Sequence, residues 1–333
     1  MSDLNKPIAV TMGDPSGIGI EITLKAWKKN NGKNPFFLIH DYEYVLAITK
    51  AMKINVPLKK IDSIEDVNRV FKSFLPIYHL DVCKNTQLGK PSKKNARIIL
   101  KAIDLALGFI KTKKVSAIVT NPVSKEIISY ALKSFRGHTE YLAKKSKSKN
   151  FCMMLINKTL KVVPLTVHVP LKKVSKLITK KTIKDTLILM NRSLKNDFNI
   201  KSPKIIVTGL NPHASDNGLL GNEENKVIKP AINALKKIIK VEGPVAADTA
   251  FTLENLKNYD AVLCMYHDQA LIPVKTIDFY NTINFTVGLN LVRTSPDHGT
   301  GFDIAKKFIA NESSLIAAIN EAARISKSRI NKR

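Results

Sequence analysis

The chain has 333 residues, of which 44% are hydrophobic and 24% are charged, a balance that excludes a chain disordered throughout and is typical of a globular protein with about two domains. The formal net charge of +27 could reflect a polyanionic partner, but only 8 of the 54 basic residues are Arg and the Lys are scattered over most of the predicted helices. We therefore interpret the charge as a bias of composition and expect no nucleic-acid partner.

Short apolar runs alternate with amphipathic segments along most of the chain. The runs predict strands at Pro7–Met12, Phe36–Ile39, Val115–Thr120, Met153–Ile156, Val162–Val167, Lys204–Gly209 and Asp260–Met265. Between them, Ser92–Lys113 places Ile99, Ile103, Ala106 and Ile110 on one helical face, and Ser92 can cap that helix. The alternation predicts an α/β protein with a mainly parallel sheet that is covered on both faces.

Two glycine-rich loops follow strand patterns. The first, "TMGDPSGIG" (11–19), precedes a helical pattern, but its spacing is not G-x-G-x-x-G and does not support a Rossmann fingerprint. The second, "SPDHGTGFDIA" (295–305), places Gly299 and Gly301 ahead of another helical pattern and could present N–H groups to a nucleotide. Each loop is also explained by the need of turns for glycine.

The cysteines and the N-terminus indicate where the protein works. Cys83, Cys152 and Cys264 are widely separated, which argues against a disulfide framework and suits a reducing compartment. The N-terminus has no signal-like apolar region, and no run approaches the roughly 18 apolar residues of a membrane span. We expect a cytoplasmic protein without a membrane partner.

Three histidines stand at the predicted carboxyl ends of three strands. His168 ends "VVPLTVH", His213 follows "IIVTGLNP", and His267 follows "AVLCMY". Because such ends meet at one edge of a parallel sheet, the rings could share a catalytic zinc or a similar divalent transition metal. Each histidine could equally be a satisfied side chain near a strand end. Asp268 could orient a ligating ring or hold a turn.

Other candidate residues are polar groups in loops. His138 and Thr139 precede a helical pattern, where N–H groups would suit a phosphate, although simple capping explains them as well. Asp248 follows a stretch of small residues and could instead be a helix cap. Arg293 follows an apolar run and could bind phosphate or carboxylate bidentately, with a structural ion pair as the alternative.

Seven segments together resemble the 4-hydroxythreonine-4-phosphate dehydrogenase family of vitamin B6 biosynthesis, in order from about residue 7 to about residue 320. They are "TMGDPSGIGIEI", "TNPVSK", "GHTEYLA", "LTVHVPL", "GLNPHA", "MYHDQALIPVK" and "TVGLNLVRTSPDHGTGFDIA". Several span eight or more residues, so chance agreement is remote. The chain departs from the family pattern at Ser215, where glycine is common, and at "AKKF" (305–308), which replaces a glycine-containing turn.

The resemblance implies a two-domain, three-layer α/β/α fold of the isocitrate and isopropylmalate dehydrogenase type, with a cleft between the domains. We expect one domain at residues 1–125 plus 285–333, which carries the cofactor loop. The other, at 126–284, is expected to carry the metal, substrate and dimer contacts. The protein is expected to be a homodimer with shared active sites that uses NAD or NADP and a divalent metal, zinc or alternatively magnesium or cobalt.

The resemblance also assigns roles to single residues. The metal ligands, drawn from both subunits, correspond to His168, His213 and His267; the substrate contacts to His138, Thr139, Lys275, Asn284 and Arg293; the cofactor contacts to His298 and Gly299; and the catalytic acidic residues to Asp248 and Asp268.

The implied reaction is oxidation of 4-phosphooxy-L-threonine to 2-amino-3-oxo-4-phosphooxybutanoate, a β-keto acid that loses CO₂. The metal would bind the adjacent amino and hydroxyl groups and acidify the alcohol. The general base could be Lys275, Asp248 or a water on the metal. Two alternatives remain: a paralogous dehydrogenase of 4-phospho-threonate or erythronate and, more remotely, a basic nucleic-acid-binding protein.

Overall fold

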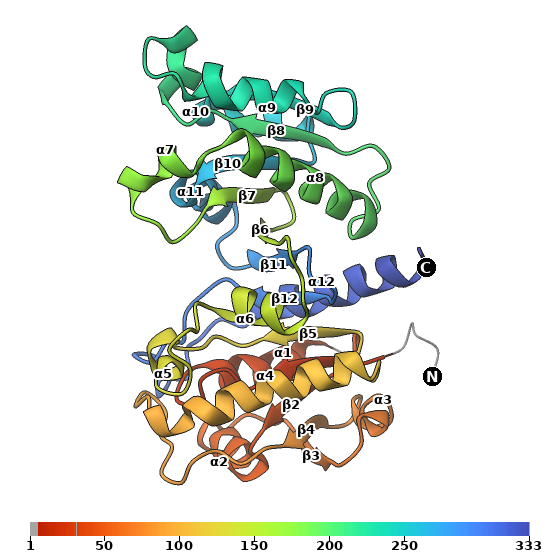
Figure 1. Cartoon of the computed structure of the whole chain (residues 1–333). Helices are drawn as coiled ribbons and strands as arrows, with labels where there is room; N and C mark the ends of the chain where they lie inside the picture. The colour runs from red at the N-terminus through yellow and green to blue at the C-terminus, as the bar shows by residue number, and fades with distance from the viewer. Residues whose placement is uncertain (1–5, 31, 333) are drawn as a thin grey trace. The chain divides into compact units, whose positions relative to one another are not determined.

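The computed structural model describes residues 6–30 and 32–332. Contacts within the chain divide it into two compact units (Figure 1). Unit 1 consists of Met1–Lys147 together with Asn290–Asn331, and unit 2 consists of Ser148–Leu289. Residues 126–147 thus pack with unit 1. Each unit is an α/β structure in which the strands are mainly parallel.

The sheet of unit 1 has the strand order β3-β4-β2-β1-β5-β12, and its paired strands are parallel. Every residue of β1, β2 and β5 is buried, and since successive side chains of a strand point to opposite faces, both faces of this sheet are covered. The strands are β1 (Ile8–Thr11), β2 (Phe36–His40), β3 (Leu58–Ile61), β4 (Leu75–His79), β5 (Ala117–Thr120) and β12 (Arg293–Pro296).

Helices cover the unit 1 sheet. The long helix α4 (Ala96–Lys111) packs against β1, β2 and β5 with its predicted apolar face, and α12 (Ser313–Ile330) packs against β1, β5 and β12. Ser92 caps the short helical turn that leads into α4, as predicted. The other helical segments are α1 (Gly19–Asn30), α2 (Tyr42–Ala51), η2 (Ile64–Asp66), α3 (Val67–Val70), η3 (Lys93–Asn95), α5 (Lys125–Ser129) and α6 (His138–Lys145).

The sheet of unit 2 has the strand order β11-β6-β7-β10-β8-β9. The pairs from β7 to β9 are parallel, whereas β6 runs antiparallel to both β7 and β11. The strands are β6 (Cys152–Ile156), β7 (Lys161–Thr166), β8 (Lys204–Thr208), β9 (Lys240–Val245), β10 (Ala261–Tyr266) and β11 (Ile283–Val287). The carboxyl ends of β7, β10 and β8 therefore lie side by side.

A helix follows β10 directly and covers one face of the unit 2 sheet. Ala270 and Val274, four positions apart on α11 (His267–Ile277), are fully buried in a core cluster with Val262 and Cys264 of β10. The other helical segments are η4 (Leu171–Lys173), α7 (Val174–Leu177), α8 (Lys180–Asn196), η5 (Pro212–Gly218), η6 (Glu224–Ile228), α9 (Lys229–Asn233), α10 (Ala247–Ala250) and η7 (Asn255–Lys257).

All seven predicted strands are confirmed within about two residues, and five more strands, β3, β4, β9, β11 and β12, were not predicted. The prediction of a helix directly after Gly301 is wrong. Residues 302–308 form a series of turns, and the next helix begins at Ser313. Phe308 adopts a left-handed backbone conformation with φ of 55°, which an α-helix cannot contain.

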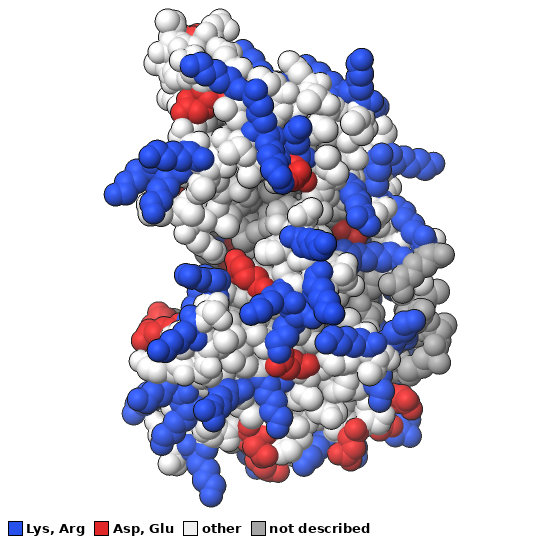
Figure 2. Space-filling view, in the orientation of Figure 1, with Lys and Arg blue, Asp and Glu red and all other residues white. Residues whose placement is uncertain are grey.

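Two further expectations concern the surface and the thiols. Figure 2 shows Lys and Arg side chains spread over the visible face with acidic side chains between them, as a composition bias would produce. In the part of the chain that the structure describes, no helix is long and apolar enough to cross a membrane. Cys83, Cys152 and Cys264 are free thiols.

Candidate active site

The three predicted metal ligands stand at the carboxyl ends of three neighbouring parallel strands of unit 2. His168 follows β7, His267 is the first residue of α11 after β10, and His213 lies in η5 after β8. The ring centroids of His168 and His267 are 6.0 Å apart, with an angle of 42° between the ring planes. Two of the three imidazoles are therefore neighbours at this edge.

The residues after His267 fix the geometry of this edge. Asp268 Oδ1 lies 2.6 Å from His267 Nδ1, a contact that orients the ring and leaves Nε2 for another partner. The Gln269 side chain accepts hydrogen bonds from Thr208 Oγ1 and from the Met265 N–H, both at 2.7 Å, and donates to the Gly209 carbonyl at 2.8 Å. Gln269 thereby ties the ends of β8 and β10 together.

A buried carboxylate holds the loop that carries His213. Glu224 is fully buried, and its Oε1 atom accepts hydrogen bonds at 2.8 Å from the N–H groups of Leu210 and Asn211. Five consecutive residues, from His213 to Asn217, have positive φ angles between 43° and 73°. Such a left-handed run is costly for residues with a Cβ atom, and strain of this kind concentrates at functional sites.

The other unit 2 candidates occupy separate elements. Asp248 is exposed on α10, which packs against η5, the element of His213. Lys275 lies on α11 with its Nζ atom 5.5 Å from the centroid of the Phe279 ring. Asn284 lies on β11, and its Oδ1 atom is buried without a hydrogen-bond partner among the described residues. A buried acceptor of this kind is ready for a ligand or an ordered water.

Within the described residues of a single chain, no three His, Cys, Asp or Glu side chains are grouped closely enough to hold a metal ion. The pair formed by His168 and His267 is the part of the predicted metal site that one chain assembles by itself.

Arg293 is the centre of a second group of candidates, in unit 1. Its side chain is 3% exposed, and Thr120 Oγ1 accepts hydrogen bonds from both Nε (3.1 Å) and Nη2 (2.6 Å). Nη1 donates to Thr139 Oγ1 at 3.4 Å. Burial lowers the pKa of Arg293 to about 10, against the opposing effect of Glu140, so the guanidinium stays charged at neutral pH. Thr120 thus fixes a desolvated cation near Thr139.

His138 lies beside this cation at the start of α6, where Gly137 provides no side-chain cap. Burial lowers the pKa of His138 well below its ordinary value of 6.5, and the charges of Arg293 and Lys125 lower it further. The imidazole is therefore neutral at pH 7. Its Nε2 atom is buried and has no hydrogen-bond partner among the described residues. A ligand oxygen would complete this arrangement.

The predicted cofactor loop is held by the first glycine loop. The Ile18 N–H donates to the Thr300 carbonyl at 3.0 Å, and a Cβ atom at Gly17 would stand only 2.6 Å from the same oxygen. A Cβ atom at Gly299, in contrast, would meet nothing within 4 Å. His298 Nδ1 lies 3.0 Å from the Gly299 carbonyl oxygen. The loop is braced on one side and open at Gly299.

The family model described as pyridoxal phosphate biosynthetic protein PdxA matches residues 33–322. The chain belongs to this family. It is 42% identical to 4-hydroxythreonine-4-phosphate dehydrogenase of Sulfurihydrogenibium sp. (strain YO3AOP1) over 317 residues, which cover 95% of this chain and 97% of the relative. It is 40% identical to the protein of that name from Zymomonas mobilis, over 96% of this chain and 95% of the relative.

Solved structures of the family agree with the fold. The structure of 4-hydroxythreonine-4-phosphate dehydrogenase from Klebsiella pneumoniae matches with a TM-score of 0.86 and 32% identity, over 97% of this chain and all of that one. A terephthalate 1,2-cis-dihydrodiol dehydrogenase structure from Burkholderia xenovorans matches over 96% of this chain and 98% of that chain, with a TM-score of 0.63 and 24% identity. At that identity the likeness concerns the fold alone.

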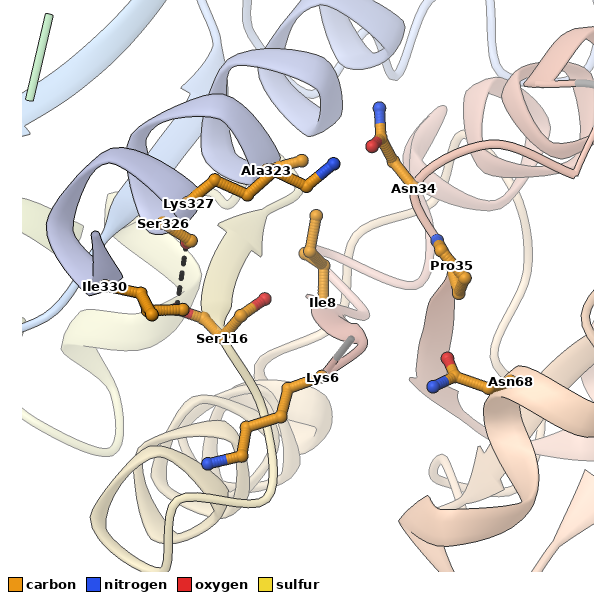
Figure 3. Close-up of a pocket in the computed structure, with 10 residues that line it drawn as sticks. All are labelled: Lys6, Ile8, Asn34, Pro35, Asn68, Ser116, Ala323, Ser326, Lys327 and Ile330. Carbon is orange, nitrogen blue, oxygen red and sulfur yellow. Dashed lines mark hydrogen bonds between the residues drawn. The ribbon is translucent and has the colours of Figure 1, made fainter. Parts of the chain in front are cut away.

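Unit 1 also contains a cavity of about 280 Å³ (Figure 3). It is found at the amino ends of β1, β2 and β5, where Ile8, Pro35 and Ser116 line it together with Ser326 and Lys327 of α12. Ser326 Oγ donates to the Ser116 carbonyl at 3.1 Å, the dashed line in Figure 3. None of the predicted site residues lines this cavity, and we assign it no part in the chemistry.

The sequence analysis missed two residues of the unit 1 group. Thr120 accepts two hydrogen bonds from Arg293, and Lys125 acts electrostatically on His138. Both belong to "TNPVSK" (120–125), whose first residue ends a predicted strand. The strand-end rule that located the histidines therefore applies to Thr120, whereas Lys125 stands further on, at the start of α5.

Proposed function

We propose that this enzyme oxidises 4-phosphooxy-L-threonine with NAD(P) in vitamin B6 biosynthesis. A hydride passes from the carbinol carbon to the nicotinamide and the hydroxyl proton is released, which gives 2-amino-3-oxo-4-phosphooxybutanoate. This β-keto acid then loses CO₂ and becomes 3-amino-2-oxopropyl phosphate. The observation that carries the proposal is the buried Arg293, held by Thr120, next to His138, whose Nε2 atom has no hydrogen-bond partner in the described part of the chain. The chain is a member of this family.

The unit 1 group is suited to the phosphate end of the substrate. A guanidinium offers parallel N–H groups that match phosphate oxygens, and it binds them more strongly when it is desolvated. Thr139 adds a hydroxyl, and the N–H groups at the start of the eight-residue helix α6 add further donors. Anchoring the phosphate in this way would hold the carbinol carbon in a reactive position.

His168, His213 and His267 would hold the divalent metal, with Asp268 orienting His267 through Nδ1. Neutral imidazole ligands favour zinc or cobalt over magnesium, which prefers oxygen. A bound metal would lower the pKa of the substrate hydroxyl and stabilise the enolate formed on decarboxylation. Among the chain's own groups, Lys275 and Asp248 are the candidates to accept the hydroxyl proton.

We further propose that the active form is a homodimer in which both chains contribute to each site. An exposed apolar residue follows within about six sequence positions after each of four predicted site residues, His168, His213, Asp248 and His267. The apolar residues include Leu171 (70% exposed), Leu219 (83%), Leu253 (70%) and Ile272 (66%). An exposed apolar surface of this kind calls for a partner, and a second copy would supply ligands that one chain lacks. Leu219→Asp should yield monomers in light-scattering measurements, and an unchanged mass would contradict the proposal.

The cofactor is proposed to bind at the loop of His298 and Gly299. Support comes from the open space at Gly299, where the absence of a Cβ atom lets a ligand approach the backbone closely. Both NAD and NADP belong in the assay. Free thiols and an ordinary metabolic substrate suit the cytoplasm.

The decisive experiment is an assay of NAD(P)H formation. We expect turnover of 4-phosphooxy-L-threonine, loss of activity with a chelator, and recovery when zinc or cobalt is added back. The matched substrate is 4-phospho-threonate, which carries a hydroxyl in place of the amino group. Preferential oxidation of phospho-threonate would replace the proposed substrate by that of the paralogous dehydrogenase, and absence of turnover with either would reject the proposal.

A single substitution tests the metal ligands. His213 is exposed, so His213→Ala should leave the fold intact while it nearly abolishes turnover and reduces the zinc retained by the purified protein. His79, which lies in unit 1 outside this group, provides the control His79→Ala. Ordinary turnover and zinc content in His213→Ala would refute the assignment.

A further inference from the structure

Lys125 lies next to the proposed phosphate group although the sequence analysis assigned it no role. It is the first residue of α5, whose N-cap is Ser124. Its Cε atom lies 3.7 Å from the point where a Cβ atom on Gly137 would stand. The Lys125 side chain therefore approaches Gly137, the residue directly before His138, and Gly137 has no side chain to block it.

The charges around His138 are unbalanced. Two cations, Arg293 and Lys125, lower its pKa, while Glu140 is the carboxylate that acts on Arg293. Glu140 Oε2 also lies 3.0 Å from the Cβ point of Gly137, so it faces the same space as Lys125. With a neutral imidazole, these groups sum to one positive charge. A phosphate monoester carries about −1.5 to −2 charges at pH 7 and would offset that excess.

We propose that Lys125 is a further substrate-binding residue whose ammonium group binds the substrate phosphate together with Arg293. This inference rests on the proposed function and adds a second cation to its phosphate site. The two cations have different tasks. Arg293 is buried and fixed by Thr120, which sets the orientation of the phosphate. Lys125 is exposed on a flexible stem and acts as a point charge that closes over the phosphate from the solvent side.

The test compares Lys125→Met with Lys125→Arg and with Lys133→Met, a control at an exposed lysine between α5 and α6. Because a charge-assisted hydrogen bond is lost from both ground state and transition state, Lys125→Met should raise KM about 10- to 100-fold. Its kcat should change less than about threefold. Lys125→Arg should recover most of the affinity, and Lys133→Met should behave like the unmodified enzyme.

Inorganic phosphate provides a readout without turnover. Titration calorimetry of the whole chain should show weaker phosphate binding in Lys125→Met, by a factor similar to the change in KM. Equal KM and equal phosphate affinity in Lys125→Met and Lys133→Met would overturn the inference. If the unmodified enzyme oxidised no phosphorylated substrate, the proposed function would fail, whereas the calorimetry would still decide whether Lys125 binds phosphate.

Discussion

Ser215 combines two unfavourable features that one substitution should remove. Its side chain is fully buried, its φ angle is 73°, and its Oγ atom has no hydrogen-bond partner among the described residues. The left-handed conformation costs a residue with a Cβ atom about 1–2 kcal/mol. A buried hydroxyl without a partner costs about 1–3 kcal/mol. Glycine also makes the unfolded chain more flexible, which offsets about 0.5–1 kcal/mol of the stabilisation expected from removing these two costs.

The sum predicts that Ser215→Gly stabilises unit 2 by about 2 kcal/mol. Ser215→Ala is the matched variant, because it removes the hydroxyl but keeps the Cβ atom in the left-handed conformation. It should therefore gain less than glycine, by up to about 1 kcal/mol.

The assay must report on unit 2. The only tryptophan, Trp27, lies in unit 1, so its fluorescence follows the other unit. Hydrogen exchange of the backbone amides of β8 and β10, measured under native conditions with increasing urea, gives the free energy of unfolding where it is needed. Our account of this loop would be refuted if Ser215→Gly were no more stable than Ser215→Ala, because the backbone conformation would then carry no cost.

Three other substitutions have expected outcomes. Lys25 Nζ lies 2.6 Å from Oε1 of Glu21, which is 2% exposed, so Lys25→Met should lower the free energy of unfolding of unit 1 by about 3 kcal/mol, measured by tryptophan fluorescence in urea. Burial raises the pKa of Asp14 to about 6 from 3.8. The folded state therefore binds the Asp14 proton more tightly than the unfolded state does. Protonation of Asp14 stabilises the folded state by about 3 kcal/mol below about pH 4, and this stabilisation is lost as the pH rises through 6. Asp14→Asn should flatten this part of the pH profile. Thr120→Val removes the oxygen that holds Arg293, and it should raise KM about tenfold with little change in kcat.

Each of these outcomes has a contradicting result. The double variant Glu21→Gln with Lys25→Met should lose less stability than Lys25→Met, and an equal or larger loss would show that the pair is not coupled. Parallel pH profiles for Asp14→Asn and the unmodified chain would reject the shifted carboxyl. An unchanged KM in Thr120→Val would show that Arg293 keeps its orientation without this contact.

The sequence predicted the continuously apolar strands well and the strands with polar residues or proline poorly. Strands such as β1 and β10 are continuous apolar runs, because parallel strands covered on both faces must be apolar throughout. The strand β3 reads "LKKI" with both lysines exposed, as the edge position in its sheet allows. The strands β4 and β9 each contain a proline, and β12 reads "RTSP". Their pairing is decided by neighbours distant in the chain, which local patterns do not contain.

The candidate site shows the same division. The rule that polar residues gather at the carboxyl ends of parallel strands placed His168, His213 and His267 correctly at one edge. The rule could not predict that Thr120 would fix Arg293, since that contact depends on the parallel pairing of β5 with β12, more than 170 residues apart. Lys125 was not predicted for a similar reason, because its proximity to His138 depends on how α5 packs beside Gly137.

The division of unit 1 into two chain segments has a consequence for synthesis on the ribosome. Apart from Lys332, unit 2 is one continuous segment, so it is synthesised between the two segments of unit 1. Unit 1 lacks β12 and α12 until unit 2 has been synthesised, because both elements follow unit 2 in the chain, and they pack against β5. Until β12 and α12 have been made, β5 has an unpaired edge, and unpaired strand edges of this kind favour aggregation during folding.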